Sequence, residues 1–133
     1  MRIMIDTNIF IPTLVFGSKY LRDMLNVVLK NHIMVLSTYG IAELENTVKT
    51  KFPQKSHLVE IFLQKISFEV VVTPEKIVKD EFPNIRDVKD LPILVSAILS
   101  DIDILITNDK DFKAVDIDRP EILEPKEFLE RYK

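Results

Sequence analysis

Residues 2–8 read RIMIDTN, a short apolar run that stops at one acidic and two polar side chains. The apolar part favours a buried β-strand over residues 2–5 and is too short to be the core of a signal peptide. Asp6 then stands directly after the strand. In an open parallel sheet, ligands bind beyond the carboxyl ends of the strands, so Asp6 is a candidate functional residue.

Further short apolar runs follow, separated by segments with apolar residues at helical spacing. We expect strands at residues 33–36, 68–72, 104–107 and 122–123. We expect helices at residues 18–31, from a Ser37-Thr38 cap to Pro53, from a Ser56 cap to residue 66, at residues 91–99 and at residues 125–132. Residues 75–86 are charged and contain Pro83, which indicates a short helix or an irregular loop. This alternation predicts an α/β fold with a parallel sheet covered on both faces.

Length and composition are those of one ordinary domain spanning residues 1–133. The chain has no cysteine, which excludes disulfides, thiolate zinc sites and cysteine nucleophiles. No run approaches the roughly 20 apolar residues of a membrane span, so we expect a cytoplasmic protein without a membrane partner. The chain has only two glycines, too few for a phosphate-cradling loop.

The predicted topology sorts the acidic residues by sheet edge. Asp6 follows the first strand, and Asp109 follows the fourth with Asp111 close behind. Glu43 lies near the start of the helix after the second strand, and Asp90 opens the helix of residues 91–99. Helices that begin at this edge present their first turns to it, so these side chains are expected to converge.

Asp101 and Asp103 precede the fourth strand, so we place them at the opposite edge and exclude them. The converging acids offer hard oxygen ligands without histidine or cysteine, which points to Mg²⁺ or Mn²⁺. Carboxylates with magnesium are typical where phosphate is the substrate. The net charge of −3 argues against nucleic-acid binding. Without the five acids Asp6, Glu43, Asp90, Asp109 and Asp111, however, the remainder carries +2.

Each acid also has a simpler interpretation, and these alternatives stay open at this point. Asp6 can form a turn, Asp90 can serve only as an N-cap, and Glu43 can face solvent. Asp109 and Asp111 lie in a sequence that is itself typical of an exposed turn. The basic residues near residues 49–55 form either a phosphate contact or a solvated face.

Four segments together resemble the signature of the PIN-domain family. They are IDTNIF (residues 5–10), STYGIAEL (37–44), RDVKD (86–90) before an apolar helix, and ITNDKDF (106–112). This resemblance implies a three-layer α/β/α sandwich with a central parallel sheet of about four to five strands. It also implies Mg²⁺- or Mn²⁺-dependent hydrolysis of RNA that leaves a 5′-phosphate and a 3′-hydroxyl.

The resemblance also has implications for the site residues and the partners. It implies that Asp6, Glu43, Asp90 and Asp109 are catalytic and, with Asp111, bind metal, while Asn8, Thr107 and Asp87 support them. The segments are similar to those of VapC-like toxins of type II toxin–antitoxin pairs. That similarity implies an RNA substrate, a homodimer and an antitoxin protein that covers the site.

Two other functions compete with that of an endoribonuclease. One is a catalytically weak PIN-fold module that binds RNA or a partner, which the net acidity favours. The other keeps the metal but acts as a phosphatase or a structure-specific DNA nuclease. A phosphatase with an aspartyl nucleophile would want a second acid two residues after Asp6, and Asn8 stands there instead.

Overall fold

The computed structural model describes residues 1–133 and contains one sheet of five strands, all of them parallel. The strands are β1 (Arg2–Ile5), β2 (Ile33–Ser37), β3 (Glu69–Val71), β4 (Ile104–Ile106) and β5 (Glu121–Leu123). They lie in the order β3-β2-β1-β4-β5. The prediction of a parallel sheet of four to five strands is therefore confirmed.

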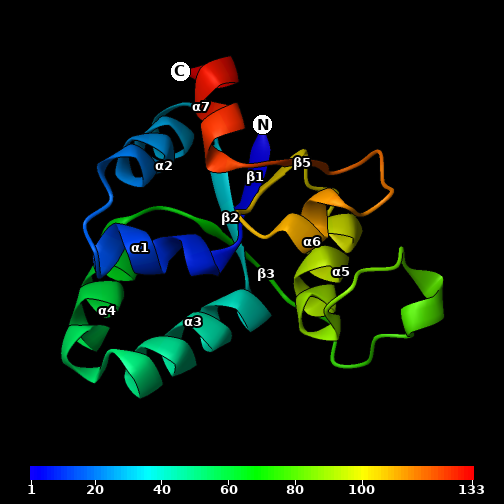
Figure 1. The fold of residues 1–133 in the computed structure, drawn as a ribbon, viewed down its shortest axis with the longest axis horizontal. Helices are drawn as coiled ribbons and strands as arrows, with labels where there is room; N and C mark the ends of the chain where they lie inside the picture. The colour runs from blue at the N-terminus through cyan, green and yellow to red at the C-terminus, as the bar shows by residue number, and fades with distance from the viewer.

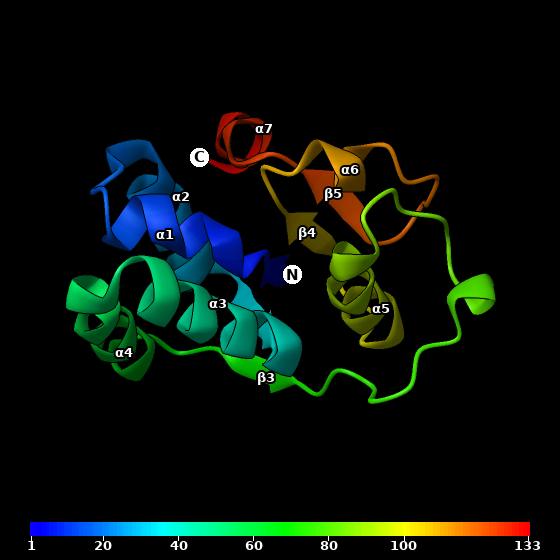
Figure 2. The same ribbon diagram turned by 60° about the horizontal axis from the view of Figure 1, so that its bottom comes forward.

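Helices cover both faces of the sheet, as Figures 1 and 2 show. The helices are α1 (Phe10–Leu14), α2 (Lys19–Asn31), α3 (Thr38–Lys51), α4 (Ser56–Lys65), α5 (Leu91–Leu99), α6 (Lys110–Lys113) and α7 (Pro125–Tyr132). Ile3 and Ile5 of β1 pack in one core with α1–α4 and α7, whereas Met4 packs in a second core with α5 and α6. Because alternate side chains of a strand point to opposite faces, the fold has three layers.

Local signals explain most element boundaries. Ser37 precedes α3 and its hydroxyl accepts a hydrogen bond from the Gly40 N–H, as an N-cap does. Ser56 is different, because it is the first residue of α4 and donates its hydroxyl proton to the Pro53 carbonyl. The prediction that Ser56 caps this helix was therefore wrong. None of the helices is both long and apolar enough to cross a bilayer.

The order of the strands reverses between β1 and β4. The chain runs from β1 outward to β2 and β3, then returns through α5 to β4 on the other side of β1. Asp6 N–H donates to the Ile106 carbonyl at 2.9 Å, which joins the carboxyl ends of the two strands. Such a reversal point opens a crevice in parallel sheets, so the polar residues that follow β1 and β4 face a common space.

Candidate metal centre

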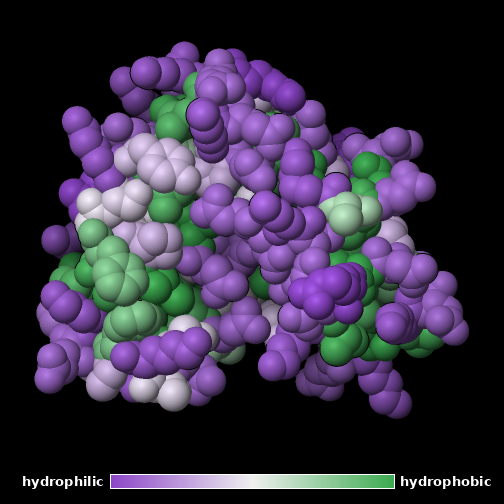
Figure 3. All heavy atoms as spheres, viewed as in Figure 1, coloured by the Kyte–Doolittle hydropathy of each residue, from purple (hydrophilic) through white to green (hydrophobic).

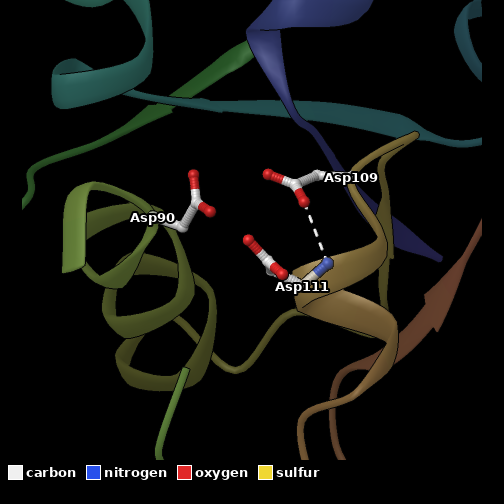
Figure 4. Close-up of side chains that lie close together, drawn as sticks. All are labelled: Asp90, Asp109 and Asp111. Carbon is white, nitrogen blue, oxygen red and sulfur yellow. Dashed lines mark hydrogen bonds between the residues drawn. The ribbon is translucent and has the colours of Figure 1, made fainter. Parts of the chain in front are cut away.

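Three aspartates from separate segments approach one another in this crevice (Figure 4). Asp90 immediately precedes α5, Asp109 follows β4, and Asp111 lies in the first turn of α6. One carboxylate oxygen of each lies within 4.8 Å of those of the other two. Figure 4 shows Asp90 facing the other two residues across a gap. This spacing suits ligands of a single cation.

The loop after β4 is fixed by hydrogen bonds that involve side chains. Asp109 N–H donates to the Thr107 hydroxyl oxygen at 3.0 Å, and Asp111 N–H donates to Asp109 Oδ1 at 2.9 Å. The second bond is the dashed line in Figure 4 and makes Asp109 the N-cap of α6. Asp109 therefore uses one oxygen for the turn, which fixes the orientation of its carboxylate.

Asp6 is buried behind the crevice, with only 3% of its surface exposed. The Thr107 hydroxyl donates to Asp6 Oδ2 at 2.7 Å, and Asn8 N–H donates to Asp6 Oδ1 at 3.2 Å. Burial raises the pKa of Asp6, the two donors lower it, and the negative charges of Asp109 and Glu43 raise it, with a net upward shift. A cation nearby would relieve this accumulation of negative charge.

Glu43 of α3 reaches the same crevice. It lines an open cleft of about 500 Å³ together with Asn8, Asp87, Asp90 and Asp109. Tyr39, one turn earlier in α3, places its hydroxyl 3.2 Å from Glu43 Oε2 and 3.2 Å from the Lys89 carbonyl. The tyrosine can therefore hold the glutamate against the segment that leads into α5.

Asp90 provides the observation that best tests whether a cation fits here. Its Oδ2 atom is buried and has no hydrogen-bond partner. Burial, together with the neighbouring carboxyl groups of Asp109, Asp87 and Asp6, raises the pKa of Asp90 to about 7. An unpartnered buried carboxylate oxygen among other acids is costly without a counter-ion. The donor set of carboxylates fits Mg²⁺ or Mn²⁺.

Two of the predicted residues have other partners in the structure. Arg86 donates two hydrogen bonds to Asp111, each at 2.8 Å, and this lowers the pKa of Asp111. Asp87 lines the cleft but accepts a hydrogen bond from Lys89 N–H at 3.0 Å, so it caps the turn before α5. The sequence does not reveal the pairing of Arg86 with Asp111, because the two residues are 25 positions apart.

The sorting of acids by sheet edge agrees with the structure. Asp103, excluded at the sequence level, accepts a hydrogen bond from Arg2 N–H at 2.8 Å, beside the amino end of β1. Tyr39 was not predicted, although its position four residues before Glu43 was a usable signal, because such pairs share a helix face. Thr7 was not predicted either; its hydroxyl donates to the Gly40 carbonyl at 2.8 Å and ties α3 to the chain after β1.

We expect Thr107→Val to destabilise the protein by about 1–3 kcal/mol, because Oδ2 of the buried Asp6 carboxylate loses its hydroxyl donor. The hydroxyl also accepts from Asp109 N–H, so the loop after β4 should loosen as well. Urea unfolding of the metal-free protein measures the change. Thr107→Ser keeps the hydroxyl group and should lose much less stability. Equal losses for the two variants would contradict the role assigned to the hydroxyl group.

Comparison with known proteins finds the same fold elsewhere. Two solved structures share the fold over nearly their whole length. One is VapBC2 from Rickettsia felis bound to a DNA fragment from its promoter, with 26% identity and a TM-score of 0.70. That match covers 93% of this chain and 98% of the other. The second is DNA-bound VapBC from Salmonella typhimurium, with 19% identity, a TM-score of 0.68 and coverage of 94% and 98%.

No curated protein sequence matches the chain significantly. The family model for the PIN domain, in contrast, matches residues 2–111. That match begins at β1 and ends at Asp111, so it includes three signature segments completely and the fourth except for Phe112. The chain therefore belongs to the PIN domain family.

Proposed function

We propose that this protein is a metal-dependent endoribonuclease, with residues 1–133 forming one nuclease domain. The observation that carries the proposal is the buried, unpartnered Oδ2 of Asp90. The Asp90 carboxylate lies close to those of Asp109 and Asp111, and Asp90 lines a cleft that is open to solvent. Asp90 and Asp109 would hold Mg²⁺ or Mn²⁺ with Glu43 and Asp6, and the metal would activate water and neutralise phosphate.

The protein's own side chains supply positioning in this proposal. Thr107 orients Asp6 and fixes the loop of Asp109, while Tyr39 orients Glu43. Lys51 and Lys89 line the same cleft and can offset the charge of an RNA phosphate. Asp111 is held by Arg86, so we assign it a supporting position beside the metal and keep Asn8 and Asp87 as supporting residues at the mouth of the cleft.

The fold is similar to that of two VapBC structures, and this similarity supports a further proposal, that the protein acts as the toxin of a toxin–antitoxin pair. An antitoxin would cover the cleft, and the toxin would form a homodimer. Co-expression with the product of a neighbouring small gene, followed by size-exclusion chromatography, tests both the antitoxin partner and the homodimer. A complex that silences RNA cleavage supports them, and a monomer that binds no such partner contradicts them.

Cleavage of single-stranded RNA in Mn²⁺ tests the enzymatic proposal. We expect Asp6→Asn to lower the rate on the order of 100-fold or more, because it removes a carboxylate from the proposed metal site. Asp23→Asn on the exposed surface of α2 is the matched control and should retain the wild-type rate. Products should carry a 5′-phosphate and a 3′-hydroxyl. Equal activity or equal inertness of the wild type and Asp6→Asn would refute the proposal, and inertness of both with RNA binding intact would favour a binding module.

A further inference from the structure

A second hollow adjoins the acidic cleft and has a different character. It encloses about 440 Å³ and is lined by residues of two segments, among them Val15, Phe16, Phe52 and Lys55. Lys51 and Phe52 line both this hollow and the acidic cleft. The two spaces are therefore neighbours that share a wall, and a bound chain in one can continue into the other.

Two aromatic side chains, Phe16 and Phe52, line this hollow. Phe16 is 69% exposed, although it is one of the largest apolar side chains of the protein. Its ring meets Phe52 edge to face, with centroids 5.5 Å apart and an interplanar angle of 89°. This arrangement leaves ring surface uncovered. Figure 3 shows hydrophobic side chains exposed on this side of the molecule, over α1 and the neighbouring helices.

The charges around the hollow have one sign. Lys51 and Lys55 are the charged residues of its lining, whereas the adjoining cleft contains Glu43, Asp90 and Asp109. In a protein with a net charge of −3, a lysine pair without a lining acid is a local exception. Exposed aromatic rings beside lysines are the combination that binds single-stranded nucleic acid, through base stacking and phosphate contacts.

We propose that this hollow binds the nucleotides of single-stranded RNA that flank the cleaved phosphodiester. Phe16 stacks on a base, with Phe52 supporting its ring from the edge, and Lys51 and Lys55 contact the neighbouring phosphates. The inference rests on the proposed function, because it takes the acidic cleft as the place of cleavage. It adds a sequence-tolerant contact outside the metal centre, since every base offers a stacking face.

Binding without cleavage tests this inference separately from catalysis. The probe is a fluorescein-labelled oligoadenylate RNA of about a dozen nucleotides, and anisotropy is measured in EDTA at low salt. We expect Phe16→Ala to weaken binding about 5- to 150-fold, the usual effect of one lost stacking contact. Phe16→Trp keeps a ring and should bind like the wild type. Leu99→Ala, an exposed apolar residue at the far end of α5, is the matched control.

The salt dependence of RNA binding tests the contribution of the two lysines separately. Replacing Lys51 and Lys55 with glutamine should reduce the slope of log affinity against log salt by about 1.4, the value for two phosphate contacts on a single strand. If Phe16→Ala binds the RNA as tightly as the wild type does, or if the wild type does not bind the RNA, the inference is overturned. A protein partner is then the better candidate for the occupant of the hollow. If binding behaves as expected but Mn²⁺ yields no cleavage, the proposed function fails while the stacking contact stands.

Discussion

Asp90→Asn is expected to bind Mn²⁺ on the order of 100-fold more weakly than the wild type, because it removes a carboxylate ligand. The same substitution should make the metal-free protein more stable. In the wild type, a buried carboxylate oxygen without a partner lies beside Asp109, and the pKa of Asp90 is raised to about 7. Asparagine carries no charge and avoids that repulsion.

The two effects of Asp90→Asn have opposite signs, which separates a metal ligand from an ordinary structural residue. Because water screens part of this carboxylate, we expect a gain of about 1–2 kcal/mol near pH 8 without metal. Thermal unfolding with and without Mn²⁺, together with calorimetric titration, measures both effects. Asp23→Asn should change neither. A metal-free Asp90→Asn protein that is less stable than the wild type would show that Asp90 is needed for folding instead.

The second large effect concerns pH. In the metal-free folded protein the pKa of Asp90 is about 7, against an ordinary value of 3.8 for an aspartate. Between about pH 4 and pH 7, Asp90 therefore keeps a proton in the folded protein that it has released in the unfolded chain. Relative to Asp90→Asn, the wild type is most stable in acid, and it loses this advantage as pH rises from about 4 through 7. The raised pKa of Asp6 acts in the same direction.

Metal binding should show the opposite dependence on pH. Ligating carboxylates must be ionised, so Mn²⁺ displaces the proton that Asp90 holds below about pH 7. We expect the affinity for Mn²⁺ to rise roughly tenfold from about pH 6 to pH 7 and then to level off. Calorimetry near pH 6 in two buffers of different ionisation enthalpy detects the released proton. Identical apparent enthalpies in both buffers would contradict the crowding of acids at this site.

Much of the fold is encoded in short-range signals that a sequence displays directly. The helix after Asp90 spans residues 91–99 as predicted, because its apolar residues are continuous and Pro92 is accepted only in a first turn. The helix of residues 125–132 was also predicted, and Glu124 and Glu127 form a capping box at its start. The short helices α1 and α6 were missed, since the first contains Pro12, which disfavours a helix interior, and the second lies in a turn-like sequence.

The candidate site was predictable to the level of the sheet edge but not to the level of contacts. Topology alone places Asp6 and Asp109 beyond the ends of neighbouring strands. Asp90 stands at an N-cap position, as expected, yet its side chain makes no capping hydrogen bond and stays free at Oδ2. Such a distinction depends on side-chain direction, which residue spacing does not encode. The pairing of Asp111 with Arg86 is likewise a tertiary contact.

Diffraction from a crystal soaked in Mn²⁺, collected at a wavelength where manganese scatters anomalously, tests the metal assignment most directly. The account predicts a peak in contact with carboxylate oxygens of both Asp90 and Asp109, at roughly 2.0–2.3 Å from each. A soaked crystal with no peak there, and with Asp90 Oδ2 hydrogen-bonded to a protein donor, would contradict it.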